Sequence, residues 1–196
     1  MSDWNDHGGT SGMSRTFFNR ILELVYPDGL YCICCGKIID SSRPYRLCNE
    51  CMDEINWAAG RTCVRCGKPL SDLNPSDTCY NCREQDHVFR RGYACAGYGS
   101  CERAMIFALK YGERTDIAPT MGEVLHDRMV LLHHTGSADL SQYDMVIPVP
   151  MYEPKRRRRG FNQAELIARE FCRRSGLPLA PRAVARVRDT HAMKGV

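Results

Sequence analysis

The sequence of 196 residues lacks the features that mark membrane and secreted proteins. It contains no apolar run of about 18 residues, the length that a membrane-spanning helix needs. Residues 1–12 are polar and rich in glycine and serine, without the apolar stretch of a secretory signal, so we expect residues 1–13 to be disordered. We therefore expect a cytoplasmic protein without a membrane span, held in a reducing compartment.

A strong excess of charge of one sign is also missing. The net charge is +4, and the single run from Lys155 to Arg159 supplies five positive charges. The overall balance is therefore no argument for nucleic-acid binding by itself. The length allows one small metal module and one ordinary domain.

Cysteine, in contrast, is abundant, with 12 residues in the chain. Eight of them form four C-x-x-C pairs, namely Cys32/Cys35, Cys48/Cys51, Cys63/Cys66 and Cys79/Cys82. A shift of 31 residues, from Cys32 to Cys63, superimposes the first four cysteines on the last four. Gly-Lys follows the first and the third pair. Such self-similarity indicates a duplicated unit.

Two C-x-x-C turns place four thiolates around one ion, which is the closed shell of a structural zinc site. Each unit spans only about twenty residues and buries little apolar surface, so the metal must supply folding free energy. The sequence therefore predicts two structural zinc ions. Spacing leaves open whether the pairs are used in tandem or cross-braced; we favour tandem, because each repeat carries a complete ligand set. Cys34 is interpreted as a bystander, because the second repeat has Arg65 there.

Other interpretations compete for these cysteines. Disulfides are disfavoured in a reducing compartment. Redox catalysis by a C-x-x-C motif does not explain four pairs in register. An iron–sulfur cluster is a minor alternative.

The flanking chain shows apolar patterns typical of helices and strands. An amphipathic helix is predicted for residues 14–27, with apolar positions Phe18, Ile21, Leu22 and Val25. Strands are predicted at 93–98, 145–149 and 183–187. Because helical patterns separate them, the predicted fold class is α/β, with parallel strands joined by crossover helices.

Three helices are predicted between these strands. The first has apolar positions Ala104, Phe107, Ala108 and Tyr111. The second begins near Asp116, and the third follows Asn162 as N-cap and ends at Gly176.

The basic run lies between the second predicted strand and the third helix. Gly160 permits a tight turn after it, and the N–H groups of the following helix favour an anion. The sequence therefore predicts a phosphate site here, with Arg159 as its foremost residue because four successive arginines cannot all face one ligand. The alternative is a solvated basic patch.

These motifs, in this order, resemble the ComF family of competence-protein-F and GntX-like proteins. The matching residues are the four cysteine pairs, Leu109-Lys110-Tyr111, Pro148-Val149-Pro150, Arg159-Gly160-Phe161-Asn162-Gln163-Ala164, and the tail from Arg186 to Thr190. The resemblance covers most of residues 17–196. It implies a double zinc ribbon at 28–90 and a type I phosphoribosyltransferase-like, parallel-sheet domain at 91–196.

The resemblance also implies ligands. Such domains bind phosphoribosyl pyrophosphate together with Mg²⁺. The pyrophosphate would be held by Arg159, Gly160, Phe161 and Asn162, and the mobile loop would contain Arg186, Arg188 and Thr190. Competence proteins and single-stranded DNA are the implied partners, and the acceptor substrate is not supplied.

The sequence departs from the family pattern in two places. Met193 stands where the family has glutamine, and no Asp-Asp pair for the ribose and metal occurs in the 196 residues. We therefore expect this chain alone to be inactive, and a sheet without the strand that carries that pair to be marginally stable and to leave helix faces uncovered.

Two functions follow from the sequence. The first is a phosphoribosyltransferase-family protein linked to DNA uptake or nucleotide metabolism. The second is a non-enzymatic zinc-ribbon module that binds single-stranded nucleic acid or a protein. Four aromatic residues in or beside the ribbons are candidates for base stacking, although packing within the module is favoured: Tyr31, Tyr45, Trp57 and Tyr80.

Overall fold

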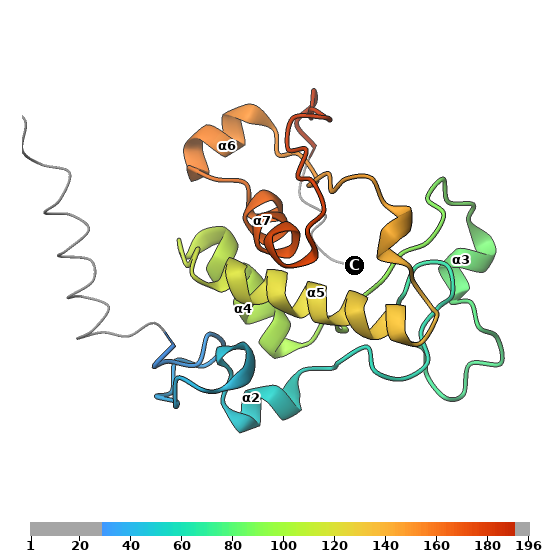
Figure 1. Cartoon of the computed structure of the whole chain (residues 1–196), viewed down its shortest axis with the longest axis horizontal. Helices are drawn as coiled ribbons and strands as arrows, with labels where there is room; N and C mark the ends of the chain where they lie inside the picture. The colour runs from blue at the N-terminus through green and yellow to red at the C-terminus, as the bar shows by residue number, and fades with distance from the viewer. Residues whose placement is uncertain (1–28, 191–196) are drawn as a thin grey trace, which may run out of the picture.

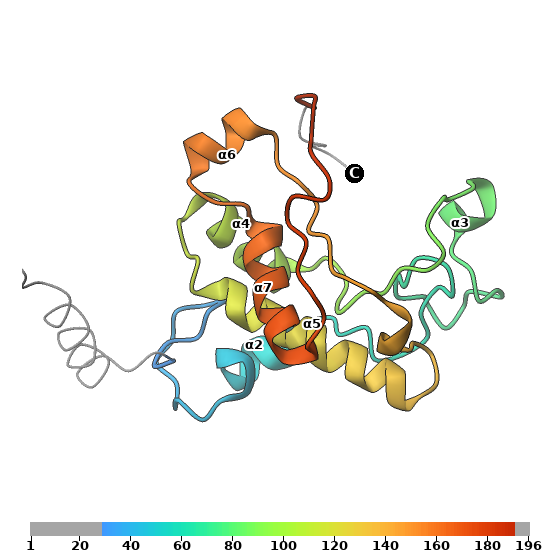
Figure 2. The same cartoon turned by 45° about the horizontal axis from the view of Figure 1, so that its top comes forward.

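The structure, a computed structural model, describes residues 29–190, and its regular secondary structure there is helical. The elements are η1 (Pro44–Arg46), α2 (Asn49–Glu54), α3 (Tyr80–Glu84), α4 (Ser100–Tyr111), α5 (Ile117–His134), η2 (Leu140–Gln142), α6 (Glu153–Arg159) and α7 (Gln163–Ser175). The two cysteine repeats lie toward opposite ends of α5, with α2 near one end and α3 near the other (Figure 1, Figure 2). The segments predicted at 1–13 and 14–27 lie outside the described residues. None of the described helices is long and apolar enough to cross a membrane.

Helices α5 and α7 form the main helix pair (Figure 1). The sequence predicted one helix that begins near Asp116 and another between the end signals Asn162 and Gly176, and both helices form. In α7 the Asn162 side chain accepts from the Ala164 N–H at 3.1 Å, and Gly176 ends the helix in the left-handed conformation. Gly122 lies where the two helices approach each other. A Cβ there would lie 2.6 Å from the Cβ of Glu170 and 2.7 Å from the carbonyl oxygen of Ile167. The absence of a side chain at Gly122 therefore permits this contact.

Helix α4 forms as predicted, but with a different buried face. Its buried apolar residues are Cys101, Met105 and Leu109, one turn apart. Phe107 and Tyr111, which the apolar pattern places toward the core, are 52% and 66% exposed. Cys101 and Met105 belong to the same core cluster as the first cysteine repeat, so α4 turns this face toward the repeat.

The predicted parallel-sheet domain is wrong, because residues 29–190 contain only isolated bridges in place of a sheet. Val146 pairs with Leu179 in one parallel bridge. The Val146 N–H donates to the Pro178 carbonyl at 2.8 Å, and the Ala180 N–H donates to the Val146 carbonyl at 2.9 Å. Pro148 and Pro150 lack the N–H groups that would continue a ladder. The apolar run at 145–149 therefore stays extended without becoming a sheet strand.

The other two predicted strands do not form either. Segment 93–98 makes a single bridge, between Ala96 and Trp57, and segment 183–187 makes none. An apolar cavity of about 380 Å³ lies between the first repeat and helices α4, α5 and α7, with Ile33, Met105 and Val124 among its lining residues. The helix faces here are thus incompletely covered.

Candidate metal centres and basic cavity

The first cysteine repeat brings Cys32, Cys35, Cys48 and Cys51 together, with their sulfur atoms all within 4.8 Å of one another. Backbone hydrogen bonds shape the first turn. The Cys32 N–H donates to the Lys37 carbonyl at 2.8 Å, and the Gly36 N–H donates to the Cys32 carbonyl at 2.9 Å. Gly36 has a φ of 75°, a conformation that favours glycine. The Cys48 N–H approaches the Cys32 sulfur at 3.4 Å, and Cys48 is the N-cap of α2, which carries Cys51.

The second repeat reproduces this geometry with Cys63, Cys66, Cys79 and Cys82. The Cys63 N–H donates to the Lys68 carbonyl at 2.8 Å, and the Cys79 N–H approaches the Cys63 sulfur at 3.3 Å. The sulfur atoms of Cys35 and Cys48 are 3.7 Å apart, and those of the corresponding pair, Cys66 and Cys79, are also 3.7 Å apart. The structure therefore groups the cysteines in tandem, one complete set per repeat.

The thiols of each site differ in acidity. Burial acts to raise the pKa of Cys32, but neighbouring backbone N–H groups donate to its sulfur and bring the pKa down to about 6. Cys63 follows the same balance and also has a pKa of about 6. Burial raises the pKa of Cys82 to about 12 and that of Cys51 well above its usual range. Each site thus contains one thiol of lowered pKa and one of raised pKa, and binding of a divalent cation would favour the thiolate form of its ligands and release protons.

The donor set fits structural zinc. Four sulfur ligands on two tight turns make a closed tetrahedral shell without a position for substrate. Three cysteines of the first site are buried and Cys35 is exposed, whereas those of the second site are buried or half-buried. Zinc bound in these sites would organise the chain around it rather than take part in chemistry.

The four aromatic residues near the repeats divide into two groups. Tyr45 and Trp57 pack against the core cluster of the first repeat, with ring centroids 5.8 Å apart. Tyr31 and Tyr80 are 53% and 66% exposed. Only the second pair is available to a stacking ligand.

Helix α6 sorts the basic run onto two faces, where the sequence predicts a loop. Glu153 accepts hydrogen bonds from Arg156 at 2.8 Å and from Arg157 at 3.2 Å, and these arginines hold the pKa of Glu153 at about 2. Arg158 and Arg159 emerge on a different face, with Lys155 one turn before them. Two of the four arginines are thus paired within the helix and two face elsewhere.

Lys155, Arg158 and Arg159 line a cavity of about 780 Å³. The rest of its wall comes from α4 and the loop after it, from the chain on either side of α6, from the start of α7 and from the last described segment. These lining residues are Lys110, Tyr111, Glu113, Met151, Phe161, Gln163, Arg186 and Thr190. Among residues 29–190, neither Arg158 nor Arg159 makes an ion pair; Arg159 donates to Gln163 at 2.9 Å and lies over the ring of Tyr111 at 5.4 Å. The cavity is therefore strongly basic.

The predicted phosphate-site residues are only partly brought together. Arg159 and Phe161 line the cavity, whereas Gly160 is the left-handed residue that ends α6. Asn162 is 8% exposed and is occupied with folding: it donates to the Val149 carbonyl at 3.1 Å and caps α7. The N-terminus of α7 thus already has an internal acceptor, and anion recognition falls to side chains.

The residues assigned to a mobile loop lie beside the same cavity. Lys155 pairs with Asp189 and donates to the Thr190 carbonyl at 3.3 Å, and the Arg186 guanidinium donates to the Thr190 hydroxyl. Arg188 is exposed and is not part of the lining. Sequence reasoning missed Lys155 and Arg158 as partners of Arg159; the i, i+3, i+4 spacing of a helix after Glu153 would have grouped them.

Comparison with known proteins supports the metal sites. The family model of the double zinc ribbon domain matches residues 21–83. With the two four-cysteine clusters, this match supports two structural zinc ions.

Several curated proteins are similar in sequence. DNA utilization protein YhgH of Shigella flexneri is 29% identical over 102 residues, which cover 52% of this chain and 44% of that protein. The Escherichia coli K12 protein of the same name is 28% identical over the same length. Competence protein F of Haemophilus influenzae is 36% identical over 53 residues, covering 27% of this chain and 23% of that protein. The matches thus span less than half the length of these curated relatives, and no solved structure matches.

Proposed function

We propose, from the ComF-family assignment that the double zinc ribbon and these relatives support, that this chain takes part in the handling of DNA during competence or DNA utilization. The relatives' names state such a role for those proteins. Within this role the two zinc sites hold the fold, because their sulfur shells are closed to ligands. The ligand-binding role belongs to the basic cavity.

The basic cavity binds the pyrophosphate group of a phosphoribosyl donor. The observation that carries this proposal is the sorting of Arg158 and Arg159 away from Glu153 and into a cavity that also contains Lys110 and Arg186. Guanidinium groups match the geometry of phosphate oxygens, and four cations offset the charge of a pyrophosphate. The Asp189 and Thr190 contacts to Lys155 bring the 186–190 segment against the cavity, where it would cover a bound anion.

Mg²⁺ would arrive with the donor. Among the described residues that line the cavity, Glu113 alone carries a carboxylate, and Mg²⁺ prefers several oxygen ligands. The oxygens of the pyrophosphate would supply the others. We expect binding of the donor by this chain and not its turnover, because the 196 residues contain no Asp-Asp pair for the ribose.

The proposal is tested by titrating phosphoribosyl pyrophosphate and inorganic pyrophosphate into the zinc-loaded chain by calorimetry. Arg159→Ala should weaken both affinities by roughly 10–100-fold, the effect of losing charge-assisted hydrogen bonds. Arg157→Ala is the matched control, because its guanidinium is held by Glu153 on another face, and it should change affinity by less than about twofold. Equal effects of the two substitutions, or no competition between the two ligands, would contradict the proposal.

A second candidate, binding of single-stranded nucleic acid, is favoured by the exposed face of α4. Tyr111 lines the basic cavity, and its ring centroid lies 5.4 Å from that of Phe107, one turn earlier in α4. The Arg103 guanidinium lies over the ring of Tyr98, 5.8 Å from its centroid. Exposed aromatic rings interleaved with arginines suit the stacking of successive bases. Fluorescence anisotropy with a labelled oligonucleotide separates the two candidates. Nucleic-acid binding is selected if the oligonucleotide affinity falls steeply with salt, is lost in Phe107→Ala, and does not change when phosphoribosyl pyrophosphate is added.

A further inference from the structure

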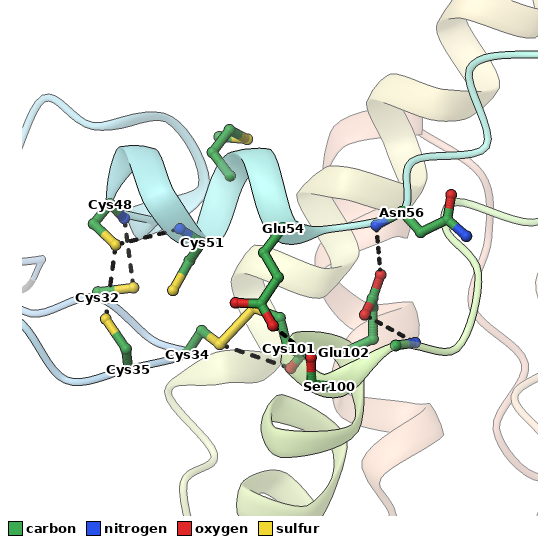
Figure 3. Close-up of a disulfide and its surroundings, with 12 residues drawn as sticks. Cys32, Cys34, Cys35, Cys48, Cys51, Glu54, Asn56, Ser100, Cys101 and Glu102 are labelled. Carbon is green, nitrogen blue, oxygen red and sulfur yellow. Dashed lines mark hydrogen bonds between the residues drawn. A yellow bond between two sulfur atoms is a disulfide. The ribbon is translucent and has the colours of Figure 1, made fainter.

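The first turn of α4 is joined to the first zinc ribbon by three consecutive residues (Figure 3). The Ser100 hydroxyl donates to a carboxylate oxygen of Glu54. Cys101 is bonded through its sulfur to Cys34, with the two Cα atoms 5.9 Å apart. The carboxylate of Glu102 accepts from the Asn56 N–H at 2.9 Å. The covalent bond thus lies between two polar contacts that already align the helix with the ribbon.

The two joined cysteines differ in access to solvent. Cys34 lies inside the metal-binding turn and is half-buried, whereas Cys101 is 2% exposed. A small oxidant would therefore reach Cys34 first. Cys101 is held beside it by the flanking contacts of α4, in the position of a resolving thiol.

A zinc ligand lies close to this pair. The sulfur atoms of Cys34, Cys51 and Cys101 are all within 4.8 Å of one another. An oxidant that reaches these three sulfur atoms can produce one of two outcomes. It can form a disulfide between Cys34 and Cys101, or it can oxidise Cys51 and so remove a ligand from the zinc site. The observed bond corresponds to the first outcome and leaves the four ligands of the site free.

We propose that Cys34 and Cys101 are a reversible dithiol–disulfide pair that locks the first ribbon onto α4 and takes up oxidation in place of the zinc ligand Cys51. The oxidant is a low-molecular-weight disulfide. The Cys34 sulfur attacks one of its sulfur atoms and releases one small thiol, and Cys101 then attacks the mixed disulfide at Cys34 and releases the second. Two protein thiols and one small disulfide thus become one protein disulfide and two small thiols.

The second ribbon provides an internal control. Arg65 occupies the position that corresponds to Cys34, and its guanidinium donates to the His87 carbonyl at 3.1 Å. The second site therefore lacks a cysteine at this position. If the pair protects its own site, the two sites should respond differently to loss of the pair.

The experiment treats the reduced, zinc-loaded chain with glutathione disulfide and follows zinc release with a chromophoric chelator. Cysteine peptides are then alkylated and mapped by mass spectrometry. The wild-type chain should lose two free thiols, yield a Cys34–Cys101 peptide and retain both zinc ions. Its thermal midpoint should rise by roughly 5–10 °C, because the bond closes a long loop in the unfolded chain.

The variants distinguish protection from a merely structural bond. Cys34→Ser and Cys101→Ala should each abolish the thermal shift and accelerate oxidation of Cys51 several-fold, while oxidation of Cys82 stays unchanged. Cys172→Ser, in α7, should behave as wild type. A wild-type chain that forms a cross-link to Cys51 with loss of one zinc, or that loses no thiols, would overturn the proposal.

Discussion

The two zinc ribbons are alike in their local geometry and differ in their surroundings. The backbone hydrogen bonds of the first repeat recur 31 residues later with nearly the same lengths, as between Cys32 and Lys37 and between Cys63 and Lys68. The first ribbon, however, belongs to a core cluster with Met105 of α4 and Ile117 of α5.

Among the described residues, none from the second cysteine repeat belongs to that core cluster. Its helix α3 has no buried residue, and Leu73 and Tyr80 are 93% and 66% exposed. Duplication thus preserved the metal site while the neighbours of each copy diverged. The spacing of its ligands thus determines the shape of a ribbon, whereas contacts with residues far along the chain determine whether the rest of the protein depends on that ribbon.

The largest expected difference between the ribbons comes from removing one ligand of each. Cys51→Ser and Cys82→Ser should each cost one bound zinc ion. Cys51→Ser should also lower the midpoint of the helical transition by more than about 10 °C, because the first site is part of the shared core. Cys82→Ser should lower it by less than about 3 °C, since loss of the second site unfolds mainly that ribbon.

Zinc analysis and thermal melts followed by circular dichroism measure this pair of effects. Cys172→Ser should retain two zinc ions and serves as the control for loss of a thiol. Equal thermal shifts for the two ligand variants would mean that the second ribbon supports the core as much as the first.

A smaller difference is expected from the glycines of the two metal-binding turns. Gly36 and Gly67 have φ values of 75° and 74°, so alanine should cost about 1–2 kcal/mol at either position. A Cβ at Gly36 has nothing within 4 Å, whereas one at Gly67 would lie 2.7 Å from backbone atoms of Gly92 and Ala94. Gly67→Ala should therefore destabilise by roughly 1–3 kcal/mol more than Gly36→Ala.

Urea denaturation of the zinc-loaded variants gives these free energies. Gly136→Ala, at a φ of 69° with open space around it, isolates the backbone contribution and should match Gly36→Ala. If Gly67→Ala loses the same unfolding free energy as Gly36→Ala and Gly136→Ala, residues 92–94 can move away from the added methyl group at no measurable cost.

The smallest expected effect concerns a tether that the first ribbon alone possesses. The Tyr45 hydroxyl donates to Asp127 of α5 at 2.9 Å, and Tyr45→Phe should cost about 1 kcal/mol at neutral pH. Burial, together with Asp127, raises the pKa of Tyr45 to about 12. Because the folded state favours the neutral phenol, this contribution is complete below about pH 10, the ordinary pKa of tyrosine, and is lost as the pH rises toward 12.

The unfolding free energy of wild type and Tyr45→Phe should accordingly converge between about pH 10 and pH 12. Tyr80→Phe, at an exposed position of the second ribbon, should leave the stability at neutral pH unchanged. A constant gap between wild type and Tyr45→Phe across this range would show that the phenol is not held by Asp127.

Local signals in the sequence predicted the parts of the molecule that depend on local chemistry. The four C-x-x-C pairs identified both metal sites, because a tight turn and its ligands lie within a few residues. Asn162 and Gly176 likewise marked the ends of α7, since caps act on adjacent backbone groups. Arg159 was singled out among four arginines because it adjoins Gly160; the structure places it in the lining of the basic cavity, and its role toward an anion stays a prediction.

Features that depend on distant contacts could not be predicted. The apolar runs at 93–98 and 145–149 indicate burial, but a strand requires a partner of matching register, and the observed bridges are isolated. Cys34 was dismissed because the repeat has Arg65, yet its partner is 67 residues away in α4. Tyr111 was placed in the core by spacing alone, whereas the structure exposes it beside the basic cavity.

The glycine at the crossing of α5 and α7 has a consequence for how this chain can be altered. Alanine forms helices better than glycine by about 1 kcal/mol, so a library selected for helix formation in α5 alone would replace Gly122. In the folded chain that methyl group would meet Glu170 and Ile167 and push α7 away. Glycine at position 122 thus lowers the helix propensity of α5 but permits the close approach of α7. Substitutions there should be tolerated only together with compensating changes in α7.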